Sequence, residues 1–467
     1  MAPASQRLGM GLAIGAWLLS GAQVNGSSSV APGTFICGGE VEQRLWRLWD
    51  GGTRQAIQAQ LIEQRLLHEG DTYALYDLQT ILSNLVAMAD RCHRTERLDQ
   101  LADLLLPVFR KLETLPPPYE HRQGWVCRGG SLCTVLNSRL GREVELVSLQ
   151  GLGLLTDLAG RLASNADRNL QRHVFVRRTA VAAQSHLERL ATPARQAWLR
   201  RRLQARSSKA TPSSELLFDS ADIWLYTVAI NTSALSSRSW RPSEAVRSMV
   251  KGVALLFAQR TTLDRNARSV SASLDAGFWM HHPDSAYSAY KGALSPVECI
   301  NVAGPLQPLP RKPPITPQPA VAVGWDISHA RRLVPFFDAV NRHRTKAVER
   351  FGLSESLLPS AQLQVAYSNQ LVDQIWNQDL RYPLFSNFWS GANGWYRVAY
   401  KPGNQACRLG TAPFGLSSAF AQGGFITWGR MQPRLGRVAQ SLYQLSISHN
   451  PIDQTWLAKY YPELSVP

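Results

Sequence analysis

The sequence predicts a mainly helical protein in which consecutive helical hairpins surround a central axis, an α/α toroid (closed or incomplete) with long aromatic loops at one face. Three observations support this prediction. Helix-length amphipathic segments follow one another in pairs, no long alternating strand pattern interrupts them, and the late helices are joined by segments rich in proline, glycine and aromatic residues. An irregular α-solenoid is the alternative, which differs in whether the ends of the helical array close.

Leucines define the first predicted helix, between Thr72 and Cys92, because they recur at the spacing of one helical face. The next helix is expected to begin at Thr95 as its N-cap and to run to Phe109. The same period predicts further helices at 143–162, 168–206, 215–233, 243–260, 326–350, 360–378 and 432–448.

Residues 264–324 lack helical period and include the proline-rich run Gly304–Pro319, which must be extended or turn-like. We interpret this segment as a long loop across the surface of one domain rather than as a linker between two. Residues 41–467 are therefore predicted to form a single domain.

The N-terminus has the features of an export signal. Arg7 precedes an apolar run, Leu8–Leu19, and small residues at 20–22 suit a cleavage site. The prediction is a signal peptide at 1–22 and a flexible lead-in at 23–40, with a periplasmic or extracellular location. A membrane anchor is the alternative, but the run is short for a spanning helix, and no later stretch is long and apolar enough for stable membrane insertion.

The six cysteines permit disulfides in an exported protein. Cys127 and Cys133 lie close enough in sequence to predict a small bridged loop, and the other pairings cannot be deduced. The formal net charge is +16, and removing residues 1–22, in which only Arg7 is charged, leaves 16 − 1 = +15. This charge favours an anionic partner. The anionic partner could be an acidic polysaccharide or oligosaccharide, a nucleic acid or an anionic membrane surface. No nucleic-acid-binding motif is present, and the aromatic loop described next favours the saccharide.

The segment Tyr382–Tyr400 (YPLFSNFWSGANGWYRVAY) combines aromatic residues with glycine, asparagine and serine, which predicts a loop. Flat aromatic faces beside polar side chains suit a sugar ligand. The predicted substrate-binding residues here are Trp389, Asn393, Trp395, Tyr396 and Arg397. The alternative is that the aromatic side chains fill the end of a helical core.

The segment Trp325–His329 (WDISH) is the strongest candidate for catalysis. Asp326 is a natural N-cap, and His329 then falls in the first helical turn, where Asp326 can accept a hydrogen bond from the imidazole. The other ring nitrogen would remain free as a general base or acid. Arg331 follows and could neutralise a substrate carboxylate. In the alternative interpretation, Asp326 is only a helix cap.

A second cluster, Ala276–Tyr290, contributes Trp279 as a binding residue and His282 and Tyr287 as candidate acids or bases. His281, His282 and Asp284 could also bind a metal, but adjacent histidines rarely bind one ion together, so neither a metal nor another cofactor is predicted.

A WDISHA helix start and an NGWY loop (393–396) in an exported helical chain resemble the α/α-toroid carbohydrate-active enzymes, among them polysaccharide lyases and helical-barrel glycosidases. The resemblance implies His329 or Tyr287 as the base and Arg331 or Arg397 as the carboxylate clamp. The expected function is therefore cleavage of an acidic glycan by β-elimination or hydrolysis. A non-catalytic glycan-binding or envelope-assembly protein is the alternative.

Overall fold

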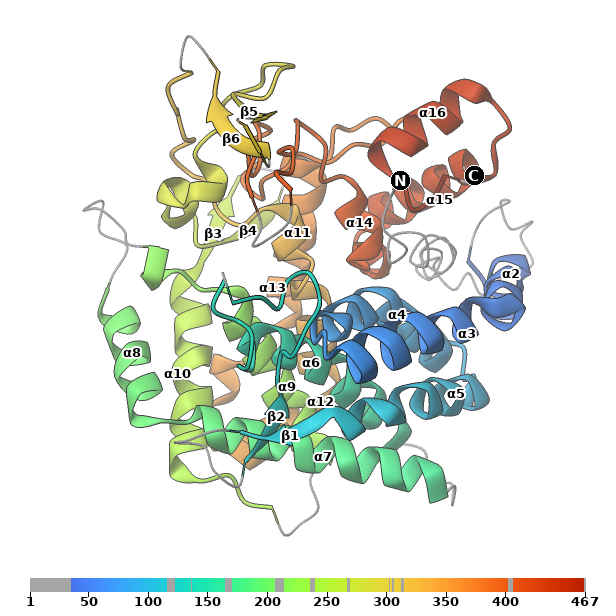
Figure 1. The fold of residues 1–467 in the computed structure, drawn as a ribbon, viewed down its shortest axis with the longest axis vertical. Helices are drawn as coiled ribbons and strands as arrows, with labels where there is room; N and C mark the ends of the chain where they lie inside the picture. The colour runs from blue at the N-terminus through green and yellow to red at the C-terminus, as the bar shows by residue number, and fades with distance from the viewer. Residues whose placement is uncertain are drawn as a thin grey trace.

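The computed structural model describes residues 35–115, 122–135, 137–163, 170–205, 214–235, 240–266, 269–301, 303–304, 306–311, 315–401 and 406–465. The described chain is mainly helical, as the sequence predicts, and it also contains a few small sheets (Figure 1). The predicted signal peptide and most of the predicted lead-in lie outside the described residues. None of the helices described here is long and apolar enough to cross a membrane.

The chain begins with helical segments that the periodicity does not predict. Helix α2 (Glu40–Leu48) and helix α3 (Arg54–Ile57) are joined and extended by π-helical turns that end at Glu69. Gly52 interrupts this region with a φ of 125°, which glycine tolerates and other residues rarely adopt. Because the turns widen to π-helical geometry around this glycine, the regular helical spacing of apolar residues is lost.

The helical prediction is confirmed for most of the remaining elements. The structure contains α4 (Tyr73–Arg91), α5 (Thr95–Leu105), α6 (Glu145–Ala163), α7 (Leu170–Leu190), α8 (Pro193–Gln204), α9 (Ser220–Leu235), α10 (Glu244–Arg260), α11 (Ile327–Ala330), α12 (Leu333–Phe351), α13 (Ala361–Gln370), α14 (Ser418–Gln422), α15 (Pro433–Ile447) and α16 (Pro451–Tyr460).

Three of the predicted boundaries are wrong. Thr95 is the first helical residue of α5, and the N-cap is Arg94. The segment 168–206 forms two helices, because Thr192 caps a new helix that begins at Pro193. The segment 326–350 is divided into the short α11 and the long α12.

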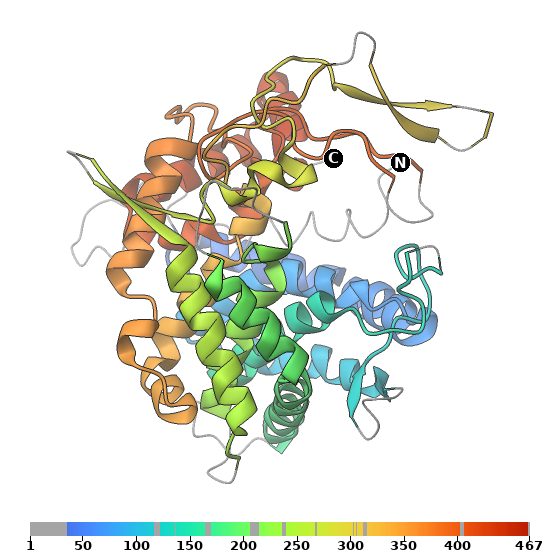
Figure 2. The same ribbon diagram turned by 90° about the vertical axis from the view of Figure 1, so that its left-hand side faces the viewer.

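Four helices form the buried centre of the fold. Helix α6 contacts α4 on one side and α9 on the other, and α9 contacts α12. Helices α6 and α9 bury residues on nearly all of their faces. Helices α5, α7 and α10 pack against these four. Figure 2 shows this body of long helices below the β5–β6 hairpin and the C-terminal segments.

Three two-stranded antiparallel sheets interrupt the helices, which the sequence did not predict. They are β1 (Leu112–Thr114) with β2 (Gln123–Trp125), β3 (Thr261–Arg265) with β4 (Val270–Leu274), and β5 (Val297–Asn301) with β6 (Leu306–Pro310). The expectation of a strandless loop at 264–324 is therefore wrong in part. Pro308 fits in β6, opposite Cys299, because both strands of a two-stranded sheet are edges. The β5–β6 hairpin projects from the body (Figure 2).

The structure contains three disulfides. The predicted Cys127–Cys133 bridge is confirmed, and Cys37–Cys92 and Cys299–Cys407 complete the set. Disulfides persist in oxidising compartments, so the three bridges agree with export from the cytoplasm.

We expect the loss of Cys299–Cys407 to destabilise the fold more than the loss of Cys127–Cys133. The first bridge spans 108 residues and the second spans 6. On loop-closure entropy alone, the difference in unfolding free energy is about 2–3 kcal/mol. Urea denaturation of the two double Cys→Ser variants measures it. Equal losses in the two variants would contradict the expectation.

Candidate functional site

The site is built at the start of α11, where the helical body meets the β5–β6 and C-terminal segments (Figure 1). The chain enters through Gly324, where a Cβ atom would lie 2.6 Å from the carbonyl oxygen of Leu274. Asp326 then caps α11, accepting hydrogen bonds from the backbone N–H groups of Ser328 at 3.0 Å and His329 at 3.1 Å. The predicted N-cap is therefore confirmed, and it places the His329 ring beside the Asp326 carboxylate.

His329 and Asp326 form a directly hydrogen-bonded pair. Nδ1 of His329 faces Oδ2 of Asp326, which is fully buried. Because an ionised carboxylate can only accept hydrogen bonds, this contact assigns the proton of the neutral ring to Nδ1 and leaves a lone pair on Nε2. The His329 side chain is 17% exposed, so a ligand can reach the ring.

The pKa of Asp326 is held low by its neighbours. Burial acts to raise it, but the charge and hydrogen bonds of His329, with a hydrogen bond from Ser328, outweigh burial and lower the pKa to about 2. Asp326 therefore stays ionised at neutral pH and keeps the imidazole oriented.

Two aromatic residues predicted as binding residues lie against His329. The Trp279 ring centroid is 5.7 Å from that of His329, and the Tyr396 hydroxyl lies 3.5 Å from Nδ1. Burial raises the pKa of Tyr396 well above its ordinary value, and the Asp326 charge raises it further, so the phenol keeps its proton. The buried indole N–H of Trp279 has no hydrogen-bond partner among the described residues.

His282 and Arg397 complete this group through Asp284. The His282 ring lies 4.5 Å from Trp279, and its Nδ1 accepts a hydrogen bond from the Asp284 backbone. Burial lowers the pKa of His282, and the charge of His329 lowers it further, which favours the neutral ring. Nε of Arg397 donates to the Asp284 carboxylate at 2.8 Å. Arg397 is 38% exposed and remains within reach of a ligand.

Arg331 turns from α11 toward α4. Its guanidinium donates to the Tyr76 hydroxyl at 3.2 Å and to the Thr80 hydroxyl at 3.1 Å. Burial acts to raise the pKa of Tyr76, but the charges of Arg331 and Arg332 outweigh it and lower that pKa. Sequence reasoning missed Tyr76 because it lies in a helix recognised only by its leucines. The signal that could have found it is its polar neighbour Thr80, one turn along the same face.

Several predicted site residues have structural partners instead. Trp389 is 1% exposed and its indole N–H donates to the Ala272 carbonyl, so its faces are part of the core. Trp395 is also buried and donates to the Gly292 carbonyl. The Asn393 side chain accepts hydrogen bonds from two backbone N–H groups and stabilises the loop. For these residues the structure supports the alternative of a filled core.

Tyr287 is half-buried, and no side-chain contact is found between it and His329 in the described structure. The backbone around Tyr287 packs against Gly394, where a Cβ atom would meet the Tyr287 carbonyl oxygen. The structure therefore places Tyr287 at the edge of the group rather than at its centre.

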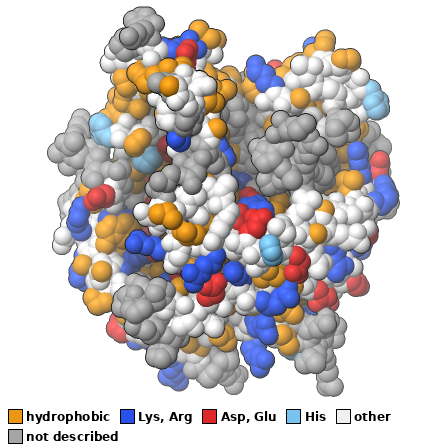
Figure 3. All heavy atoms as spheres, viewed as in Figure 1, with side chains coloured by type: hydrophobic (Ala, Val, Ile, Leu, Met, Phe, Trp, Pro, Cys, Tyr) orange, Lys and Arg blue, Asp and Glu red, His pale blue; other side chains and the backbone are white. Residues whose placement is uncertain are grey.

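A cavity of about 600 Å³ adjoins the site, and Arg331 and Arg332 line it. Figure 3 shows the face of the molecule that is seen in Figure 1. Acidic and basic side chains lie side by side near its middle, and other basic side chains are scattered over it. Among the described residues, one group of potential metal ligands lies within coordination distance (Cys37, Glu42 and Cys92), and its two cysteines form a disulfide.

The low pKa of Asp326 predicts a pH-dependent contribution to stability. The folded pKa, about 2, lies below the ordinary value of 3.8. A carboxyl group whose pKa is lower in the folded state stabilises the fold at pH values above its unfolded pKa. This stabilisation is lost as the pH falls through its folded pKa. The contribution is about 2 kcal/mol above pH ~4.

Urea unfolding of the wild type and Asp326→Asn measures this contribution, because asparagine keeps the capping acceptor without the charge. We expect the difference between the two proteins to shrink as the pH falls from about 4 to about 2. A difference that does not change over this range would contradict the assignment.

Comparisons with known proteins give no relative: no family model, no curated protein and no solved structure matches the chain.

Proposed function

We propose that the protein is an exported enzyme that cleaves an acidic polysaccharide or oligosaccharide, by β-elimination in preference to hydrolysis. The observation that carries the proposal is the pair of His329 and Asp326 with the protonated Tyr396 beside it. This arrangement supplies one nitrogen base and one oxygen acid at the same end of a helix.

β-Elimination from a uronate needs a base for the C5 proton and an acid for the glycosidic oxygen at C4. Nε2 of His329 takes the C5 proton, because Nδ1 is held by Asp326. Electrons of the broken C5–H bond form the C4–C5 double bond as the C4–O bond breaks. The Tyr396 hydroxyl, kept protonated by its raised pKa, gives its proton to the departing oxygen. Nε2 then releases its proton to solvent and Tyr396 takes one from solvent, which restores both groups.

The substrate carboxylate must be neutralised before C5 becomes acidic. Arg397 and Arg331 are the candidate guanidinium groups, and a guanidinium can hold a carboxylate through two N–H donors. Arg397 is the better placed of the two because it lies 5.3 Å from the Tyr396 ring. The free indole N–H of Trp279 adds a donor for a sugar hydroxyl.

Burial of Asp326 favours elimination over hydrolysis. A glycosidase of the two-carboxylate type needs carboxyl groups that reach the sugar. Asp326 is fully buried, and both of its oxygens already accept hydrogen bonds from Ser328 or His329. It therefore acts as a positioning residue for His329 and not as a nucleophile.

The fold and charge support the same proposal. Helices α4, α6, α9 and α12 contact one another in chain order, and α5, α7 and α10 lie against them, which is compatible with the inner and outer helices of an α/α toroid. The excess of basic residues favours an acidic glycan, and the three disulfides suit an extracellular or periplasmic enzyme.

The test is a panel of acidic and neutral polysaccharides incubated with the purified protein from residue 23 onward. The absorbance of a new C4–C5 double bond and the number of reducing ends are followed in the same samples. A rise in both on a uronate polymer is the expected result. Reducing ends alone would indicate hydrolysis. If neither signal rises on any polymer but the protein binds one of them, it is a glycan-binding protein instead.

A further inference from the structure

The cavity beside Arg331 runs along one face of α4. Its walls come from α4, α6 and α12 and from residues 422–430, and Trp224 of α9 also lines it. At one end Arg331, two residues after His329 in the chain, donates a hydrogen bond to the Thr80 hydroxyl. The volume of about 600 Å³ is within the range of small-molecule sites.

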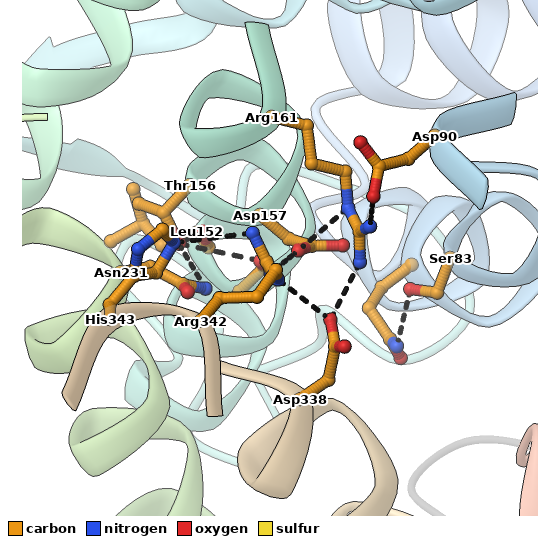
Figure 4. Close-up of polar contacts among 12 residues, drawn as sticks. Ser83, Asp90, Leu152, Thr156, Asp157, Arg161, Asn231, Asp338, Arg342 and His343 are labelled. Carbon is orange, nitrogen blue, oxygen red and sulfur yellow. Dashed lines mark hydrogen bonds and ion pairs between the residues drawn. The ribbon is translucent and has the colours of Figure 1, made fainter. Parts of the chain in front are cut away.

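One wall of the cavity is a fixed network of opposite charges (Figure 4). Arg161, which is 5% exposed, lies among three carboxylates: those of Asp90, Asp157 at 3.1 Å and Asp338 at 2.6 Å. Arg342 donates to Asp157 and, at 3.0 Å, to Asp338. Burial acts to raise the pKa of Asp338, but the two arginines outweigh it and lower that pKa to about 2. These side chains therefore stay charged and in place.

The cavity as a whole carries an excess of positive charge. Six arginines and three aspartates line it, which leaves three positive charges. Two of these six arginines stand at the end of α4 away from His329: burial, together with the nearby charge of Arg430, lowers the pKa of Arg91 to about 10. An anion bound between them would relieve this repulsion.

The remaining walls supply neutral hydrogen-bonding groups. Gln79, Thr80, Ser83 and Asn84 present amides and hydroxyls along α4. The indole N–H of Trp224, a residue that is 2% exposed, has no hydrogen-bond partner among the described residues. A ligand with several hydroxyl groups would satisfy such a lining.

We propose that this cavity binds one sugar-acid unit, a ring with several hydroxyls and a single carboxylate. The carboxylate pairs with an arginine of the positively charged walls, and the hydroxyls donate to Asp90 or Asp338 and exchange hydrogen bonds with the α4 side chains. The three aspartates disfavour a densely charged anion such as phosphate, because their negative charges would repel it.

This inference rests on the proposed function for the choice of ligand, since the cavity would hold one end of the acidic glycan next to His329.

The binding test is independent of turnover. Calorimetric titration of the full exported chain with glucuronate, and with glucose as the uncharged match, measures affinity at low salt. Glucuronate is expected to bind at least about tenfold more tightly than glucose, because a charged hydrogen bond is lost with the carboxylate.

Two variants test whether the ligand binds in the cavity. Ala87→Leu fills part of the space from a half-buried position on α4, and Arg430→Gln removes an exposed charge without touching the core. Each is expected to weaken glucuronate binding about tenfold or more. Arg110→Gln is the matched control, because Arg110 is 57% exposed and pairs with Glu63 on the surface. It is expected to leave the affinity unchanged. Thermal unfolding of each variant confirms that it is folded.

The outcomes separate this inference from the proposed function. If wild-type protein does not bind glucuronate, or if Ala87→Leu and Arg430→Gln bind it as the wild type does, the cavity inference is wrong even when the protein cleaves a polymer. If both variants lose binding while no polymer is cleaved, the cavity inference stands and the proposed reaction is wrong.

Discussion

Replacing His329 with alanine is expected to lower kcat on the cleaved polymer by about two to four orders of magnitude, the usual contribution of a general base. The physical reason is that Nε2 is the proton acceptor of the pair, since Nδ1 is hydrogen-bonded to Asp326. Stability is expected to fall as well, because the fully buried Asp326 carboxylate loses its hydrogen-bond partner. Initial rates of double-bond formation measure the loss, and unfolding by urea measures the stability.

His449→Ala is the matched control, because His449 is exposed in the connection between α15 and α16. It is expected to retain wild-type kcat. Asp326→Asn tests the positioning role: it should lower kcat and alter the pH dependence of kcat, because the orientation and tautomer of His329 are no longer held. A His329→Ala variant with wild-type kcat would exclude His329 as the base.

Removing the carboxylate of Asp222 is expected to be among the most destabilising single changes in the described chain. Arg202 and Asp222 are both fully buried, with side chains 0% exposed, and a hydrogen bond of 2.9 Å joins Nη1 to Oδ1. The guanidinium also lies 3.8 Å from the Trp198 ring. Asp222→Ala leaves this cation buried without its partner, which costs about 3–5 kcal/mol. Urea denaturation at neutral pH measures the loss.

The neighbouring surface pair provides the control. Arg201 and Glu215 lie 2.9 Å apart with side chains 63% and 68% exposed. Glu215→Ala is expected to cost less than about 1 kcal/mol, because water screens the pair. If Asp222→Ala does not fold at all, the milder Asp222→Asn gives a measurable midpoint. A loss as small as that of Glu215→Ala would show that the buried pair does not hold this part of the fold.

The helices of the body could be predicted because their apolar residues recur on one face, as in α4. The N-terminal helices could not, because π-helical turns around Gly52 disturb the spacing. The sheets could not be predicted because their strands have only three to five residues, which is too short for an alternating pattern to be recognised. The Cys127–Cys133 bridge was predictable from proximity in sequence, which the other two bridges lack.

The site was partly predictable because two of its residues are close in sequence, as Cys127 and Cys133 are. Asp326 and His329 are close in sequence, so a helix cap brings them together. Trp279, His282, Tyr396 and Arg397 were also identified as candidates, but their approach to His329 depends on long-range packing. The aromatic composition of 382–400 could not separate Tyr396, beside the site, from Trp389, in the core. The Arg161 network was missed because only Asp157 lies on the same helix as Arg161, while Asp90 comes from α4 and Asp338 from α12.

For the proposed enzyme, the Cys299–Cys407 disulfide has a consequence for when activity would begin. Cys407 lies next to Arg408, which pairs with Tyr400 in the irregular ladder that also joins Tyr396 to Thr411. The bridge thus ties the backbone that presents Tyr396 to strand β5. In a reducing compartment this tie would be absent, whereas helices α6, α9 and α12 contain no cysteine. Under the proposed function, we therefore expect a chain with reduced cysteines to be less active than the oxidised protein, because the backbone that presents Tyr396 is then not tied to β5.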